Sequence, residues 1–141
     1  MGAIRRKLAE NRRLSGGRVH DDAGVPVALM IVDDNERFRV RARRRLEADG
    51  YAVVAEAEDG ASALEAVRRH RPDVVLLDIG LPDMTGLSVA ERLTREPGPP
   101  AVVLTSTHDA ADFGDRIVSC GARGFVPKAA LSGDAISALL A

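Results

Sequence analysis

The chain has 141 residues, a length that suits one domain able to bury its own core without disulfides or a structural metal. Twenty basic and 21 acidic side chains leave a net charge of −1, which excludes a global electrostatic attraction to nucleic acid. The single Cys120 excludes an internal disulfide, and no apolar run approaches the roughly 18–20 residues of a membrane span, so we expect a cytoplasmic protein.

Residues 1–24 differ in composition from the rest of the chain. They contain many arginines, few large apolar side chains and a Ser-Gly-Gly break. We predict a basic, disordered N-terminal arm, with a marginal helix over residues 3–14 as the alternative, because an isolated helix of about 12 residues is barely stable in water. The folded domain is then expected to comprise residues 25–141.

From Val25 onward, short apolar runs alternate with helical patterns. We predict strands over 27–32, 51–57, 72–78, 100–106 and 124–128, and helices over 35–50, 60–70, 85–96, 109–121 and 131–141. The third strand is continuously apolar up to Asp78, which is typical of a strand buried on both faces of a parallel sheet. These five βα units predict a doubly wound α/β fold with a parallel five-stranded sheet, whose ligands bind outside the carboxyl ends of the strands.

Polar residues stand at the carboxyl ends of four of these strands. Asp33 and Asp34 directly follow the first strand, Asp78 ends the third, Thr105 and Ser106 end the fourth, and Lys128 ends the fifth. Three carboxylates in one crevice repel each other unless a cation offsets them or one stays protonated. Oxygen ligands without a His or Cys cluster favour Mg²⁺. Lys128 and Thr105 suit phosphoryl oxygens, so Asp78 is a candidate phosphoryl acceptor.

Four segments of the chain resemble the receiver domain of two-component response regulators. They are IVDDNE (31–36), VVLLDIGLPDMTGL (74–87), VVLTS (102–106) and GFVPKAAL (124–131). The resemblance covers about residues 26–141 and implies a flavodoxin-like (βα)5 fold. The segments 34–50 and 124–131 most resemble the receivers of LuxR/NarL-type regulators, which carry a C-terminal helix-turn-helix.

The printed sequence stops just after its last predicted helix. We therefore expect no helix-turn-helix and no direct DNA binding by this chain. Whether it is a stand-alone receiver or part of a longer regulator stays open, as do its cognate kinase and output partner.

The resemblance implies a role for each acidic residue. Asp78 would accept a phosphoryl group from a histidine kinase or phosphotransfer protein. Asp34 and Asp78 would ligate Mg²⁺ directly and Asp33 mainly through water, while the backbone carbonyl of Gly80 would complete the metal site. Gly80 offers no side chain to orient or block water, so the lifetime of the phosphoryl group stays open.

The resemblance also implies a switch. Thr105 and Phe125 match a pair in which the hydroxyl moves toward the phosphoryl group and the ring turns inward, and Lys128 matches the lysine of the family. The surface of the fourth helix, fifth strand and fifth helix would change for an output partner, with homodimerisation on phosphorylation as one outcome.

Simpler interpretations compete with these roles. Asp33 and Asp34 are also good caps for a helix starting near Asn35, and Phe125 fits core packing. The carboxylate of Asp78 fits turn chemistry together with Gly80, Pro82 and Asp83. The first helix carries six arginines, which suit either a docking surface for an acidic partner or a solvated face. They are Arg37, Arg39, Arg41, Arg43, Arg44 and Arg45.

Two other functions compete with a signalling switch. A Mg²⁺-dependent phosphohydrolase would use Asp78 as its nucleophile, but it needs a general acid that is commonly two residues further on, where Gly80 stands. A pseudo-receiver would be an interaction module that never uses its phosphate, and the complete acidic set argues against it. We therefore expect a signalling domain that catalyses only its own phosphoryl transfer and dephosphorylation, not an enzyme.

Overall fold

The computed structural model describes residues 13–14, 18–19 and 24–141. Strands β1 (Arg13–Leu14) and β2 (Arg18–Val19) form a separate antiparallel pair. Most of the predicted arm over residues 1–24, including the alternative helix over 3–14 apart from Arg13–Leu14, lies outside the described residues.

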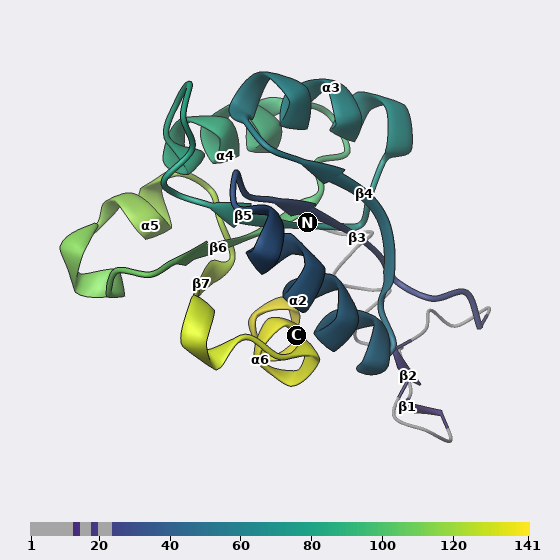
Figure 1. The fold of residues 1–141 in the computed structure, drawn as a ribbon. Helices are drawn as coiled ribbons and strands as arrows, with labels where there is room; N and C mark the ends of the chain where they lie inside the picture. Colours follow the sequence, from purple (N-terminus) through teal and green to yellow (C-terminus); the bar gives the residue numbers. More distant parts are fainter. Residues whose placement is uncertain (1–12, 15–17, 20–23) are drawn as a thin grey trace.

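One parallel sheet organises the domain, and Figure 1 shows its strands running through the middle of the molecule. Its strands are β3 (Ala28–Val32), β4 (Ala52–Ala57), β5 (Val74–Asp78), β6 (Ala101–Ser106) and β7 (Gly124–Pro127). Their order is β4-β3-β5-β6-β7, and every neighbouring pair is parallel. The predicted doubly wound, flavodoxin-like sheet is confirmed.

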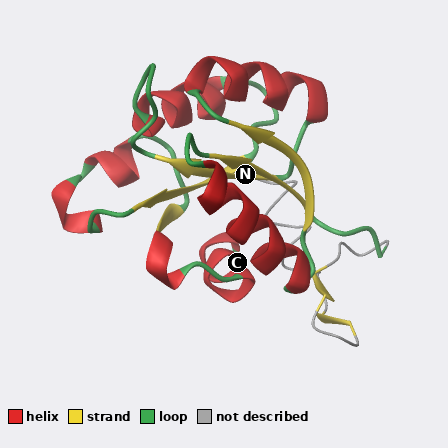
Figure 2. Ribbon diagram, viewed as in Figure 1, coloured by secondary structure: helices red, strands yellow, loops and turns green. Residues whose placement is uncertain are grey.

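Helices cover both faces of this sheet (Figure 2). They are α2 (Glu36–Ala48), α3 (Gly60–His70), α4 (Gly86–Arg95), α5 (Arg116–Ser119) and α6 (Gly133–Leu140), with short 3-10 turns η1 (Ala110–Asp112) and η2 (Lys128–Ala130). The sheet residues of β3 alternate between two cores, because successive side chains of a strand point to opposite faces. Leu29 and Ile31 pack with α2 and α6, whereas Met30 and Val32 pack with α3, α4 and α5.

The buried stripes of the helices follow the predicted periodicity. Phe38, Ala42 and Leu46 are the buried residues of α2, at the spacing of one helix face. Strands β5 and β6 are buried along their whole length, as expected for central strands of a sheet covered on both sides. The sheet is therefore a firm base for the residues at its carboxyl edge.

The predicted continuous helix over 109–121 is wrong. The structure has η1, then Gly114 with a left-handed φ of 57°, and then only the four residues of α5. Glycine adopts this conformation without the steric cost that other residues incur, so the chain turns out of the helix there. Val118 is 79% exposed, while Ile117 and Cys120 are buried.

None of the helices in the described part of the chain has the length and apolar character needed to span a bilayer.

Candidate functional site

Three carboxylates meet at the carboxyl edge of the sheet. Asp33 and Asp34 directly follow β3, and Asp78 is the last residue of β5. These strands are neighbours and parallel, so their ends lie at one edge. One oxygen from each carboxylate lies within 4.8 Å of the others, with Asp33 and Asp78 buried and Asp34 exposed. The convergence predicted from the strand ends is confirmed.

Lys128 reaches the carboxylates from the end of β7, the edge strand of the sheet. It begins η2, directly after β7, and its Nζ lies 2.6 Å from Oδ2 of Asp33 and 3.6 Å from Oδ2 of Asp78. The ammonium also lies 4.4 Å from the centroid of the Phe38 ring. Among the described residues, the buried Oδ2 of Asp33 has no hydrogen-bond partner apart from this ion-paired ammonium.

Negative charge is in excess around Asp78. Burial raises the pKa of the Asp78 carboxyl above its usual value, and the charge of Asp33 raises it further. The Lys128 ammonium and the Gly80 N–H, which donates to Oδ1 of Asp78 over 3.2 Å, act in the opposite direction without cancelling the rise in pKa. One lysine therefore does not balance three carboxylates, and the oxygen ligands fit a hard divalent cation.

The loop after β5 starts from the sheet itself. The Ile79 N–H donates to the Thr105 carbonyl over 3.0 Å, and the N–H groups of Leu81 and Gly86 both donate back to the Ile79 carbonyl, over 3.2 and 2.8 Å. Gly80 is exposed within this narrow loop. Its N–H contact places its backbone beside the Asp78 carboxylate, while the role of its carbonyl as a metal ligand stays a prediction.

Thr105 and Phe125 lie on the other side of Asp78. Thr105 pairs in register with Asp78 on the neighbouring strand β6, and its buried Oγ1 donates to the Val126 carbonyl over 2.7 Å. Phe125 on β7 is partly buried, and its ring lies 6.1 Å from the Phe113 ring at an angle of 43°. The hydroxyl is therefore held by β7, next to the strand position that carries Phe125.

The competing interpretation of Asp33 and Asp34 as helix caps is wrong for α2. Asn35 is the N-cap, and its side chain accepts from the Phe38 N–H over 3.0 Å. Oδ1 of Asp33 accepts from the Asn35 N–H over 2.8 Å, one residue before the helix. Asp33 thus supports the cap with one oxygen and meets Lys128 with the other, while Asp34 is not a cap.

Residues 29–140 match the family described as the response regulator receiver domain. This chain belongs to that family. The solved receiver domain of the response regulator NarL from Mycobacterium tuberculosis is 34% identical, with a TM-score of 0.76, covering 82% of this chain and 96% of that one.

Two of the curated relatives that the chain matches are named as regulators. A transcriptional regulator of Pseudomonas aeruginosa is 39% identical over 100 residues, which are 71% of this chain and 48% of the relative. The transcriptional regulatory protein PdtaR of Mycobacterium tuberculosis is 31% identical over 126 residues, which are 89% of this chain and 61% of the relative. The receiver thus spans about half the length of the curated relatives it matches.

The arginines of α2 in this receiver fall into two groups. Arg39 and Arg43 bind the Glu56 carboxylate of β4 over 3.0 and 2.8 Å, and Arg45 binds Asp49 over 2.9 Å. The other three, Arg37, Arg41 and Arg44, are exposed and have no ion pair within the described ranges. Three guanidinium groups on one helix face repel each other, so this face attracts an anionic group.

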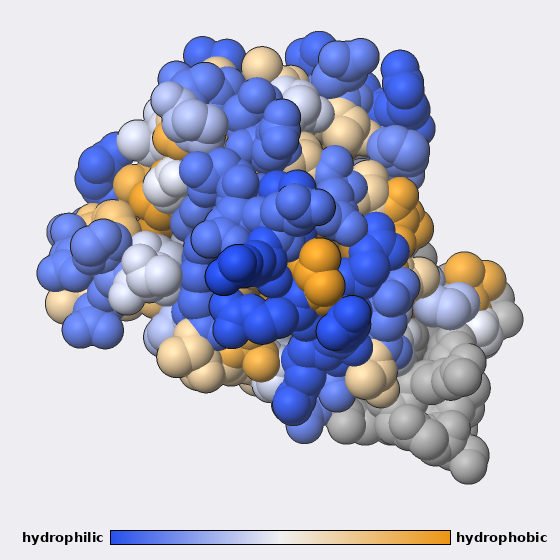
Figure 3. Space-filling model, viewed as in Figure 1, coloured by the Kyte–Doolittle hydropathy of each residue, from blue (hydrophilic) through white to orange (hydrophobic). Residues whose placement is uncertain are grey.

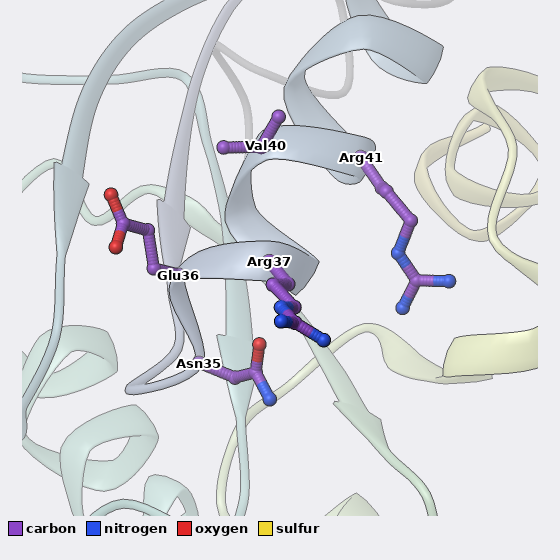
Figure 4. A pocket seen from close by; sticks show the side chains of 5 residues that line it. All are labelled: Asn35, Glu36, Arg37, Val40 and Arg41. Atoms are coloured by element: carbon purple, nitrogen blue, oxygen red, sulfur yellow. The ribbon is translucent and has the colours of Figure 1, made fainter.

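A shallow hollow of about 640 Å³ lies on the same face of α2 (Figure 4). It is lined by Asn35, Glu36, Arg37, Val40 and Arg41. Val40 is 42% exposed, and the space-filling view from this side shows a small apolar area surrounded by hydrophilic surface (Figure 3). The face therefore combines unpaired positive charge with one exposed apolar contact.

Sequence reasoning missed the role of Asp83 and treated it only as turn chemistry. Its carboxylate accepts from the N–H groups of Gly60 and Ala61, over 2.7 and 3.0 Å, at the start of α3. A carboxylate in a loop can accept hydrogen bonds from many different donors, so no local sequence pattern indicated this contact.

Proposed function

We propose that this receiver is a phosphorylation-driven switch in which Asp78 accepts a phosphoryl group. The observation that carries the proposal is the convergence of Asp33, Asp34 and Asp78 with the Lys128 ammonium 3.6 Å from Oδ2 of Asp78. A buried nucleophilic carboxylate beside a cation site and a lysine is suited to phosphoryl transfer.

The acceptor chemistry involves one bond formed and one bond broken. A carboxylate oxygen of Asp78 forms a bond to phosphorus, while the bond from phosphorus to a kinase histidine nitrogen, or to the acetate oxygen of acetyl phosphate, breaks. We assign Asp34, Asp78 and the Gly80 carbonyl as direct Mg²⁺ ligands, with Asp33 acting mainly through water. Mg²⁺ bound there would offset the charge that develops on the phosphoryl oxygens. Lys128 supplies a second positive charge to these oxygens.

Transfer would then act on Thr105. Its hydroxyl donates to the Val126 carbonyl, a neutral acceptor, and phosphoryl oxygens on the neighbouring strand would offer a charged and therefore stronger acceptor. Turning Oγ1 toward Asp78 would release its bond to β7 and let Phe125 turn inward. The surface formed by α5, β7 and α6 would change, which is how a local charge reaches an output partner.

The unpaired arginine face of α2 is our proposed docking site for the histidine kinase or phosphotransfer protein. Support comes from its position at the same edge as the acceptor, since α2 begins just after Asp34, and from the hollow around Val40. A partner with acidic side chains around an apolar contact would fit this face.

The test is to incubate the purified chain with Mg²⁺ and acetyl phosphate and to measure its intact mass beside the Asp78→Asn variant. We expect the parent to gain one phosphoryl group and the variant to gain none. Label that persists in the variant would remove Asp78 from this role, and no label in either would favour a pseudo-receiver. Multiple turnovers of a chromogenic phosphoester would favour the phosphohydrolase.

A histidine kinase that labels the parent extends this test to docking. Reversing charge with Arg37→Glu and Arg41→Glu should slow labelling by the kinase about tenfold or more and leave labelling by acetyl phosphate unchanged. Arg92→Glu is the matched control, because Arg92 is exposed on α4 and has no ion pair within the described residues. Equal slowing by the control would count against docking on α2.

A further inference from the structure

One carboxylate fastens the loop that follows Asp78 to a different helix. Oδ1 of Asp83 accepts from the Gly60 N–H over 2.7 Å and Oδ2 accepts from the Ala61 N–H over 3.0 Å. The first amides of a helix have no partner within the helix and carry partial positive charge, which favours a carboxylate. These two hydrogen bonds hold the pKa of Asp83 below its usual value, because they stabilise the charged form of the carboxyl.

A second carboxylate caps the same helix without touching the loop. Asp59 is the N-cap of α3, and its Oδ1 accepts from the Ser62 N–H over 2.8 Å and from the Ser62 hydroxyl over 2.6 Å. The first three amides of α3 are thus divided between Asp83, which belongs to the loop, and Asp59, which belongs to the helix. Capping of α3 and anchoring of the loop are therefore separable by mutation.

The loop also packs directly on the start of α3. A Cβ added at Gly60 would collide with the Met84 side chain, so the absence of a side chain there permits this contact. Among the described residues, Asp83 is the only member of loop 79–85 whose side chain hydrogen-bonds to an element other than α4. The tip of the loop is held by Asp83, and its base is held by the Ile79 carbonyl.

Gly80 lies between these two anchors. Its N–H donates to Oδ1 of Asp78, and the Ile79 N–H donates to the Thr105 carbonyl, so a displacement of the loop would move atoms that contact the acceptor. We propose that Asp83 is a positioning residue, which sets the affinity of the carboxylate site for its divalent cation by holding loop 79–85 on α3. The inference rests on the proposed function, because it assigns that cation to the site.

The experiment measures Mg²⁺ affinity by calorimetric titration of the unphosphorylated full chain and of three variants. Asp83→Ala should raise the Kd about tenfold, the scale expected when a partner that orients a metal site is removed. Asp83→Asn keeps one acceptor oxygen and should restore part of the affinity. Asp59→Ala weakens the cap of the same helix and should leave the Kd within twofold of the parent.

Amide hydrogen exchange without metal gives a second readout. Asp83→Ala should speed exchange at Gly60, Ala61 and Gly80, whereas Asp59→Ala should speed it at Ser62 and leave Gly80 unchanged. Equal Kd values for the parent and Asp83→Ala, or an equal loss of affinity in Asp59→Ala, would overturn the inference. Acetyl phosphate labelling of the parent separates the two failures, since an unlabelled parent contradicts the proposed function, whereas a labelled parent with an unchanged Kd contradicts only the role of Asp83.

Discussion

The loops that follow the neighbouring strands β5 and β6 differ sharply in how they are held. Loop 79–85 is closed on the Ile79 carbonyl at its base and bound through Asp83 to α3 at its tip. After β6, residues 107–112 are all exposed, and the N–H of His108 donates to the Ser106 hydroxyl over 3.0 Å.

Contacts between aromatic rings pack the segment that follows β6. The Phe113 ring lies 6.5 Å from that of His108 and 6.1 Å from that of Phe125. Ring contacts of this kind tolerate rearrangement better than hydrogen bonds to a carboxylate, because they depend less on direction. In our proposal the loop after β5 therefore helps to bind the cation and the phosphoryl group, and the segment after β6 changes its conformation.

The largest expected effect comes from removing the ammonium of Lys128. Lys128→Ala would leave the buried Asp33 carboxylate without its partner, and breaking such a pair costs about 3 kcal/mol of the free energy of unfolding. Urea unfolding measures this loss. The double variant Asp33→Asn with Lys128→Ala should recover much of it, because no charge is left unpaired.

A loss below about 1 kcal/mol in Lys128→Ala would contradict the ion pair as a main support of the acidic site. It would also weaken the comparison, since the carboxylates after β3 and β5 would then be held no more firmly than the segment after β6.

A smaller effect of opposite sign is expected from Asp78→Asn. The folded chain raises the pKa of Asp78, so between the unfolded and folded pKa values it binds more protons than the unfolded chain. The stability contributed at low pH is therefore lost as pH rises through the folded pKa. At neutral pH the variant should be more stable than the parent, as measured by thermal unfolding.

The pH series gives this prediction its control. The stability gap between Asp78→Asn and the parent should close as pH falls below the unfolded pKa. A gap that is constant with pH would show that burial of the charge is not its cause.

The smallest effect concerns the break after β6. Gly114→Ala places a Cβ on a residue with φ of 57° and should cost about 1 kcal/mol through backbone strain, although no atom lies within 4 Å of the new Cβ. Gly98→Ala is the matched control, because its φ of 63° and open surroundings impose the same strain away from this segment.

Both glycine variants should therefore lose similar stability in thermal unfolding. Only Gly114→Ala should change amide exchange at Phe113 and Ile117. A change of amide exchange at Phe113 and Ile117 in Gly98→Ala would contradict this prediction, because the segment after β6 would then respond to strain elsewhere in the chain.

Most of the fold was predictable because its signals are local. Continuous apolar runs such as 74–77 and the helical spacing of Phe38, Ala42 and Leu46 are properties of short stretches, and both appear in the structure as expected. Chain order then placed Asp33, Asp34 and Asp78 at one edge, since parallel strands end on the same side.

The break at Gly114 was missed for the opposite reason. The pattern of residues 109–121 indicated one continuous helix, yet a left-handed glycine interrupts it and Val118 is exposed. A glycine within a helical pattern is compatible with both outcomes, so the local pattern alone does not decide between them.

Residue order by itself thus determined the parallel sheet, the two buried faces and the acidic edge, because hydrophobic periodicity and strand direction need no knowledge of distant partners. Only the tertiary structure decided which groups pair there: Lys128 with Asp33, Thr105 with the Val126 carbonyl, and Asp83 with the start of α3. Each partner comes from a different element. A charge or hydroxyl finds its partner only after the packing of strands and helices has brought them within reach.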